Sequence, residues 1–138
     1  MVGPEAPEAG WKAFTENITG GGRLELDPAG IEQCIKLCQE HAEDMRAFAR
    51  RARNDLRALD LGIGEKDIES AKDLARKFDE KAIGGSENID SGNTAVGLFL
   101  AHEAYALDMK SMFEATLTRY REQDAAFTGN LNQTGQEL

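Results

Sequence analysis

The feature that most constrains this sequence is an apolar seam that continues for four heptads. After the stretch LDPAG, apolar and small residues recur in alternating steps of four and three. This spacing keeps them on one face of a helix and is typical of a helix that lies along a partner helix. The seam comprises Ile31, Ile35, Cys38, Ala42, Met45, Ala49, Ala52, Leu56 and Leu59.

The start and the end of this helix are also marked in the sequence. Asp27 is a favourable N-cap residue, and Pro28 suits the first helical position because its missing N–H has no intrahelical partner there. The stretch LGIG, residues 61–64, predicts the end. We therefore expect one long helix from residue 28 to about residue 60.

Two further helices are predicted. Residues 65–82 place an apolar set on one face and are followed by Gly84 and Gly85, which favour a helix stop. That set is Ile68, Ala71, Leu74, Ala75, Phe78 and Ala82. A second long seam follows a loop in which Asp90, Ser91 and Asn93 are possible caps: Ala95, Phe99, His102, Ala106, Met109, Phe113, Thr116, Tyr120, Gln123 and Phe127.

The two matched seams predict an all-α protein built on a long antiparallel helical hairpin, with the shorter helix near the bend. No stretch alternates with the period of a strand. We expect three parts: an extension at 1–23, the hairpin domain at 24–127, and a polar, frayed C-terminal tail at 128–138. Within the extension, Trp11, Phe14 and Ile18 fit a short amphipathic turn ahead of a glycine hinge. This extension either folds back on the body or docks on a partner.

Two long helices cannot cover all of each other's flanks. We therefore expect apolar residues beside the seams to stay partly exposed, namely Leu37, Phe48, Leu98, Tyr105 and Met112. Such a surface predicts a dimer, either with a second copy or with a helical paralogue, in a four-helix-type bundle. The residues expected to form the packing and dimer seam are Ile31, Ile35, Met45, Leu56, Phe99, Met109 and Phe113.

The charge and the hydropathy of the chain limit the classes of partner and the location that the sequence predicts. The chain has 16 basic and 25 acidic residues, and its net charge of −9 disfavours nucleic acid or an anionic membrane surface as the main target. The most apolar stretch, TAVGLFLAHEAYAL, carries His102 and Glu103, so no stable membrane insertion is expected. The opening MVGPEAPEAGW has neither a basic n-region nor an apolar h-region. We expect either a cytoplasmic protein or one secreted without a cleaved signal peptide.

A metal site is the most enzyme-like possibility in the sequence. Cys34, Cys38 and His41 share one helix face, and with His102 from the other long helix they could hold zinc. In an antiparallel hairpin, however, Cys34 and His102 lie far apart along the axis, so packing is the favoured interpretation. We predict no cofactor, although metal binding by Cys34, Cys38 and His41 stays open.

The sequence also contains no catalytic constellation. The chain has no Gly-x-Ser-x-Gly elbow and no phosphate-binding Gly-x-x-x-x-Gly-Lys loop. His102-Glu103 begins like a zincin helix, but position 106 is alanine where the second histidine should stand. We therefore predict a protein that is not an enzyme.

Several of these parts together resemble a known family. RLELDPAGIEQC at the start of a long helix, a glycine-rich bend, a second long helix and Tyr-x-x-x-Asp near its end are similar to the helical-hairpin substrates of actinobacterial type VII (ESX) secretion. This is the WXG superfamily in the broad sense, here without its Trp-X-Gly turn. The resemblance covers roughly residues 24–127 and implies a secreted, non-enzymatic substrate or effector that acts through protein contacts.

The resemblance also implies an export signal. In that family the Tyr-x-x-x-Asp/Glu element is recognised by the secretion ATPase, and it carries over here to Tyr120 and Asp124 only. A tyrosine and a carboxylate four residues apart share one helix face, so a receptor can read both together. The alternative is that Tyr120 only packs and Asp124 only faces water, in a cytoplasmic adaptor or chaperone that dimerises through the same seams.

Overall fold

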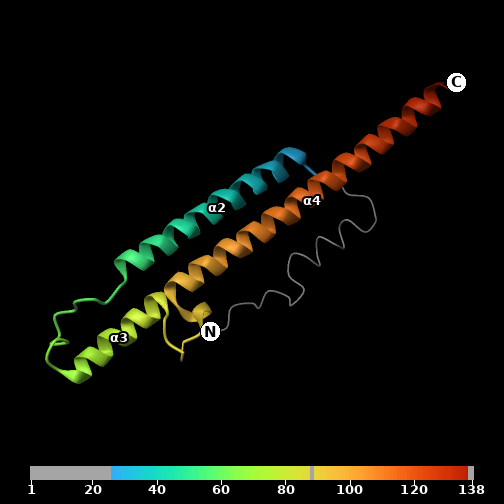
Figure 1. The fold of residues 1–138 in the computed structure, drawn as a ribbon. Helices are drawn as coiled ribbons and strands as arrows, with labels where there is room; N and C mark the ends of the chain where they lie inside the picture. The colour runs from blue at the N-terminus through green and yellow to red at the C-terminus, as the bar shows by residue number, and fades with distance from the viewer. Residues whose placement is uncertain (1–25, 88, 137–138) are drawn as a thin grey trace. The chain divides into compact units, whose positions relative to one another are not determined.

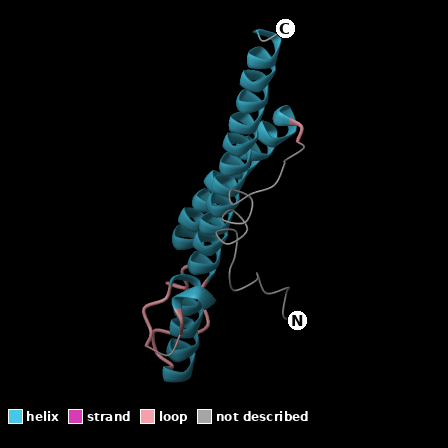
Figure 2. Ribbon diagram, turned by 90° about the vertical axis from the view of Figure 1, so that its right-hand side faces the viewer, coloured by secondary structure: helices cyan, strands magenta, loops and turns pink. Residues whose placement is uncertain are grey.

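The structure, a computed structural model, describes residues 26–87 and 89–136 (Figure 1). These residues form three α-helices, α2 (Pro28–Asp55), α3 (Glu69–Ile83) and α4 (Ala95–Gln136), and one 3-10 turn, η1 (Ser91–Asn93). No strand occurs in the described ranges (Figure 2), so the predicted all-α class is confirmed there. The amphipathic turn expected around Trp11, Phe14 and Ile18 lies outside the described residues.

Contacts divide the chain into two compact units. Within the described residues, the first unit comprises 26–39 and 107–136, and the second unit comprises 40–87 and 89–106. The helices α2 and α4 each contribute to both units, whereas α3 and η1 belong to the second.

The core of the second unit is made of small side chains. Ala49 and Ala52 of α2 form a buried cluster with Val96 of α4. Beside this cluster the rings of Phe48 and Phe99 lie with their centroids 5.7 Å apart, in a tilted arrangement. Close packing of this kind needs small residues where two helix backbones approach each other, and the seam supplies them.

In the first unit, polar contacts join α2 to α4. Lys110 Nζ donates to Gln39 Oε1 at 2.9 Å, and Arg121 pairs with Glu32. These are contacts at or near the surface, where an ion pair contributes about 0–1 kcal/mol. They align the two helices more than they stabilise them.

One predicted exposure is wrong. Leu37, Phe48, Leu98 and Tyr105 are exposed, as expected of residues beside the seams, but Met112 is buried, with 4% of its surface accessible. Its carbonyl accepts a 2.8 Å hydrogen bond from the Thr116 hydroxyl, and Leu117 is buried one residue further on. In this part of α4 the buried stripe is therefore wider than the predicted seam, because Met112 and Leu117 are buried beside the seam residue Thr116.

The helix α2 ends earlier than predicted, at Asp55. Arg57 donates to Asp79 of α3 through Nε and Nη2 at 3.1 and 3.0 Å, and the backbone N–H of Ala58 donates to the same carboxylate at 3.2 Å. The hydrogen bond from Arg57 holds the pKa of Asp79 below its usual range, although partial burial opposes the shift. The Leu56 N–H still donates to the Ala52 carbonyl at 3.1 Å, but the Ala58 N–H is bound to Asp79, so the helical hydrogen bonds stop here and Leu59 lies beyond the helix.

The predicted start of α3 at residue 65 is also wrong, because the Glu65 side chain binds the preceding loop. Its carboxylate accepts hydrogen bonds from the backbone N–H groups of Leu61, Gly62 and Ile63, the last two at 3.0 and 2.9 Å. Gly62 has a φ of +68°, which glycine adopts without strain. The carboxylate thus fills a concave set of amides of the kind that binds anions, and α3 begins at Glu69.

The start of α4 depends on a residue that the sequence reading missed. Asp90 caps η1 by accepting from Gly92 N, but Thr94 caps α4: its hydroxyl accepts from Gly97 N at 2.9 Å. A Cβ at position 97 would lie 1.7 Å from the Ser91 carbonyl oxygen. Only glycine therefore fits this first turn.

The helix α4 continues to Gln136, beyond the predicted end at Phe127. The residues 128–135 are polar or small apart from Leu131, and all are exposed. The frayed tail expected for 128–138 is therefore helical over most of its length, since neither Gly129 nor Gly135 adopts a positive φ that would end the helix.

The Asp79 contact predicts the effect of a substitution. Asp79→Ala removes the partner of both Arg57 and the Ala58 amide, so the melting temperature followed by circular dichroism should fall by several degrees. The matched control is Asp73→Ala in the same helix, since Asp73 pairs only with the side chain of Arg76 within α3. Equal melting temperatures for the two variants would contradict this account of how α2 ends.

The Glu65 contact predicts a pH dependence. Hydrogen bonds from its own backbone amide and from the three loop amides, only partly opposed by burial, lower the pKa of Glu65 from 4.5 to about 2. Because the folded-state pKa is depressed, the stabilisation of the loop is complete above about 4.5 and is lost as the pH falls towards 2. The amide NMR signals of Gly62 and Ile63 should titrate with a midpoint near 2, and Glu65→Gln should abolish this step. A midpoint near 4.5 would contradict the contact.

Candidate functional site

The predicted export-signal residues both lie on α4 in the first unit. Tyr120 is half-buried, and Asp124, one turn further on, is exposed. Neither side chain makes a hydrogen bond or an ion pair with another residue in the part of the chain that the structure describes. Four residues of helix place the ring and the carboxylate on adjacent turns of the same side. The tyrosine side chain is therefore partly packed and partly accessible, and the accessible carboxylate follows it on the next turn.

The surroundings of this pair are charged. Arg121 is engaged by Glu32 of α2, and Glu122 is exposed on the same turn but on a different side of α4. Together Tyr120 and Asp124 present to a binding partner an aromatic side chain beside an unpaired negative charge on a regular helix. A receptor with an apolar slot next to a cation could bind both at once. No proton transfer or nucleophilic step is suggested by such a pair.

The residues predicted to pack or dimerise are mostly half-buried. In the first unit these are Ile31, Ile35, Met109 and Phe113, and in the second unit Met45 and Phe99. Leu56 differs: it follows the end of α2, and 53% of its surface is exposed. Each half-buried side chain keeps apolar area that packing within the chain does not cover.

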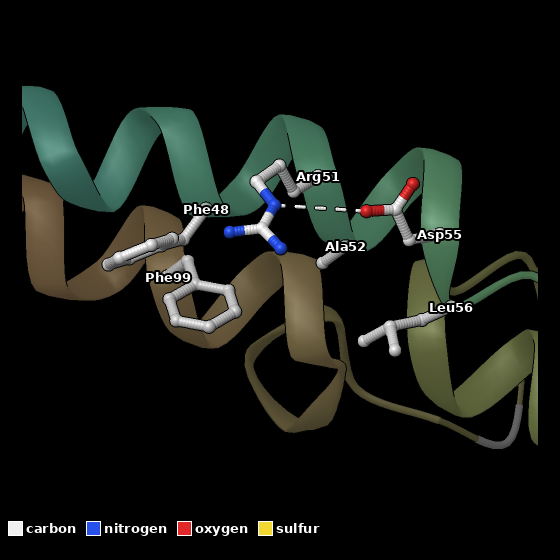
Figure 3. Close-up of a pocket in the computed structure, with 6 residues that line it drawn as sticks. All are labelled: Phe48, Arg51, Ala52, Asp55, Leu56 and Phe99. Atoms are coloured by element: carbon white, nitrogen blue, oxygen red, sulfur yellow. Dashed lines mark ion pairs between the residues drawn. The ribbon is translucent and has the colours of Figure 1, made fainter.

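In the second unit, Leu56 lines an open hollow of about 250 Å³ (Figure 3). The rings of Phe48 and Phe99 lie on one side of it, and Ala52 lies between these rings and Leu56. The Arg51 guanidinium lies towards the two rings, and its Nε makes an ion pair with Asp55 at 3.8 Å. Sequence reasoning identified the apolar members but missed Arg51 and Asp55, which periodicity places on the solvated side of α2. The hollow is an apolar surface with a polar rim.

The cysteines and histidines are distributed over both units. Cys34 and Cys38, in the first unit, are half-buried free thiols, and burial together with the neighbouring Cys34 raises the pKa of Cys38. His41 and His102 are exposed residues of the second unit. Within residues 26–87 and 89–136, no group of three histidine, cysteine or acidic side chains could hold a metal ion.

Comparisons of the chain with protein-family models, with curated proteins and with solved structures found no match. Over the described ranges, none of the helices combines the length and the apolar character needed to cross a membrane.

Proposed function

We propose that this chain is a non-enzymatic helical protein that is exported by a type VII (ESX) secretion system and acts through protein contacts. The observation that carries the proposal is the distribution of apolar side chains. Seven of the ten buried hydrophobic residues in the described part are alanines, whereas Leu98, Tyr105 and Phe48 keep 50%, 42% and 39% of their surface exposed. Large apolar side chains with so much of their surface exposed to water favour a partner that covers them.

The partner is a second copy or a helical paralogue, and the assembly is a four-helix-type bundle of two antiparallel hairpins. Contacts in each unit support an antiparallel pairing of α2 with α4. In the second unit Arg46 pairs with Glu103 at 3.1 Å while the later residue Phe48 contacts the earlier residue Phe99. In the first unit Glu32 pairs with Arg121, and the later Gln39 pairs with the earlier Lys110.

The export signal in this proposal consists of Tyr120 and Asp124, recognised by the secretion ATPase. The half-buried ring fixes the position of the element on α4, and the exposed carboxylate supplies the charge that a receptor reads. A rigid helix lowers the entropy cost of presenting both groups in one geometry. The resemblance to helical-hairpin substrates of actinobacteria supports this assignment, and so does the accessibility of Asp124.

A secretion assay in a competent actinobacterial host tests the signal. Asp124→Asn removes the charge at an exposed helix position, so export should fall at least about tenfold, the effect of losing roughly 1.4 kcal/mol of recognition, while the intracellular level of the folded chain stays the same. Tyr120→Ala should also reduce export, but a loss of packing contributes to its effect.

The matched control is Glu122→Gln, which makes the same charge change on the same turn of α4, on a different side. It should leave export unchanged. Equal export of wild type, Asp124→Asn and Tyr120→Ala would show that the signal assignment is wrong and would favour the cytoplasmic adaptor or chaperone. Equal loss in Asp124→Asn and Glu122→Gln would point to net charge rather than to a recognised element.

A further inference from the structure

The face of α3 that the sequence predicts to be packed is only half covered. Ala71, Ala75 and Ala82 are buried, but Leu74 and Phe78 keep 46% and 56% of their surface exposed. The small residues therefore form the contact with the rest of the second unit. The large apolar residues of the same helix remain in water.

The two exposed apolar residues of α3 belong to a groove of about 360 Å³. It is lined by Leu74, Lys77, Phe78, Lys81 and, from the loop after the helix, Ile89. We call it the α3 groove. Its four helical members stand at i, i+3, i+4 and i+7, which is the spacing of a single helix face. Apolar and basic side chains alternate along this face.

The two lysines of the α3 groove differ from the other basic residues on or near α3 in their ion pairing. Lys72 pairs with Glu69, and Arg76 pairs with Asp73 and Glu80. The remaining acid of the helix, Asp79, is held by Arg57 of the segment after α2. Every acidic side chain of α3 thus has a basic partner.

Lys77 and Lys81, in contrast, make no ion pair with any residue in the described ranges. The chain as a whole has nine more negative than positive charges, and on this face of α3 two uncompensated lysines lie beside the exposed side chains of Leu74 and Phe78. The chemistry complementary to them is a carboxylate close to an apolar anchor.

We propose that the α3 groove binds an acidic amphipathic helix of a second protein. Leucine-like side chains of that helix pack on Leu74 and Phe78, and its carboxylates pair with Lys77 and Lys81. In helix-in-groove recognition the bound helix places its anchoring side chains at i, i+3, i+4 and i+7. The lining residues of α3 follow the same spacing, so the side chains of the two helices can interdigitate. This inference stands independently of the export proposal, because it uses no residue of α4.

Two other occupants fit less well. A second copy that docked through this same surface would form a two-fold interface, in which four lysines meet without acidic partners. An anionic membrane would attract the two lysines, each worth about 1 kcal/mol near a charged surface, but it would repel a chain of net charge −9. An acidic helix satisfies both the apolar and the basic members of the groove.

The test uses the full chain and a fluorescein-labelled synthetic peptide of leucine, glutamate and alanine. Its length is roughly 18 residues, enough for helix formation, with leucines at i, i+3, i+4 and i+7 and glutamates flanking them. A second peptide carries lysine in place of every glutamate. Fluorescence anisotropy should show saturable binding of the acidic peptide and none of the basic one.

The variant Lys77→Glu/Lys81→Glu should raise the Kd for the acidic peptide at least about tenfold, and Phe78→Ala should also weaken binding. The matched control Lys66→Glu/Lys72→Glu makes the same change in net charge outside the groove and should leave the Kd within about twofold. Circular dichroism verifies that all variants keep the helical content of the wild type.

Four results would overturn the proposal. The first is no binding of the acidic peptide by the wild-type chain, and the second is an equal loss in both double variants, which would indicate unspecific attraction. The third is binding to vesicles of anionic phospholipid that the groove variant alone abolishes, which would assign the surface to a membrane. The fourth is a dimer that the groove variant alone dissociates, which would assign it to a second copy.

Discussion

The packing of α2 against α4 on alanines is the constraint on which the rest of the structure depends. Ala49 and Ala52 meet Val96 in the core of the second unit, and small residues of this kind let two helices approach closely. Burying each methyl group contributes only about 0.8 kcal/mol, compared with about 1.5–3 kcal/mol for a leucine or phenylalanine. The helices are thus paired closely but with a thin core, and most large apolar side chains remain available to other molecules.

The apolar periodicity was sufficient to predict the helices and several local features. The start of α2 at Pro28 and the exposure of Leu37 and Leu98 follow from the pattern and from capping chemistry alone. The helix ends could not be predicted in the same way. Asp79 ends α2 from a position more than twenty residues away, and the Glu65 side chain takes up the residues that were expected to begin α3. Both effects depend on tertiary contacts.

The candidate sites were predictable to different degrees. The motif spacing placed Tyr120 and Asp124 on one helix, and the structure adds that the ring is half-buried and the carboxylate exposed. No comparable pattern in the sequence predicted the α3 groove, because the apolar periodicity assigned Leu74 and Phe78 to the same buried face as the neighbouring alanines. Which part of an apolar face is covered depends on the elements packed against it, and a single sequence does not contain that information.

The central claim is that a helical partner covers the apolar surface left by this thin core. The most direct measurement is the mass in solution by sedimentation equilibrium, for the full chain alone and mixed with the product of a neighbouring gene. The account predicts either a dimer of twice the 15.1 kDa chain mass or a one-to-one complex with a helical paralogue. A chain that stays monomeric in both experiments, while it unfolds cooperatively and remains soluble, would contradict it.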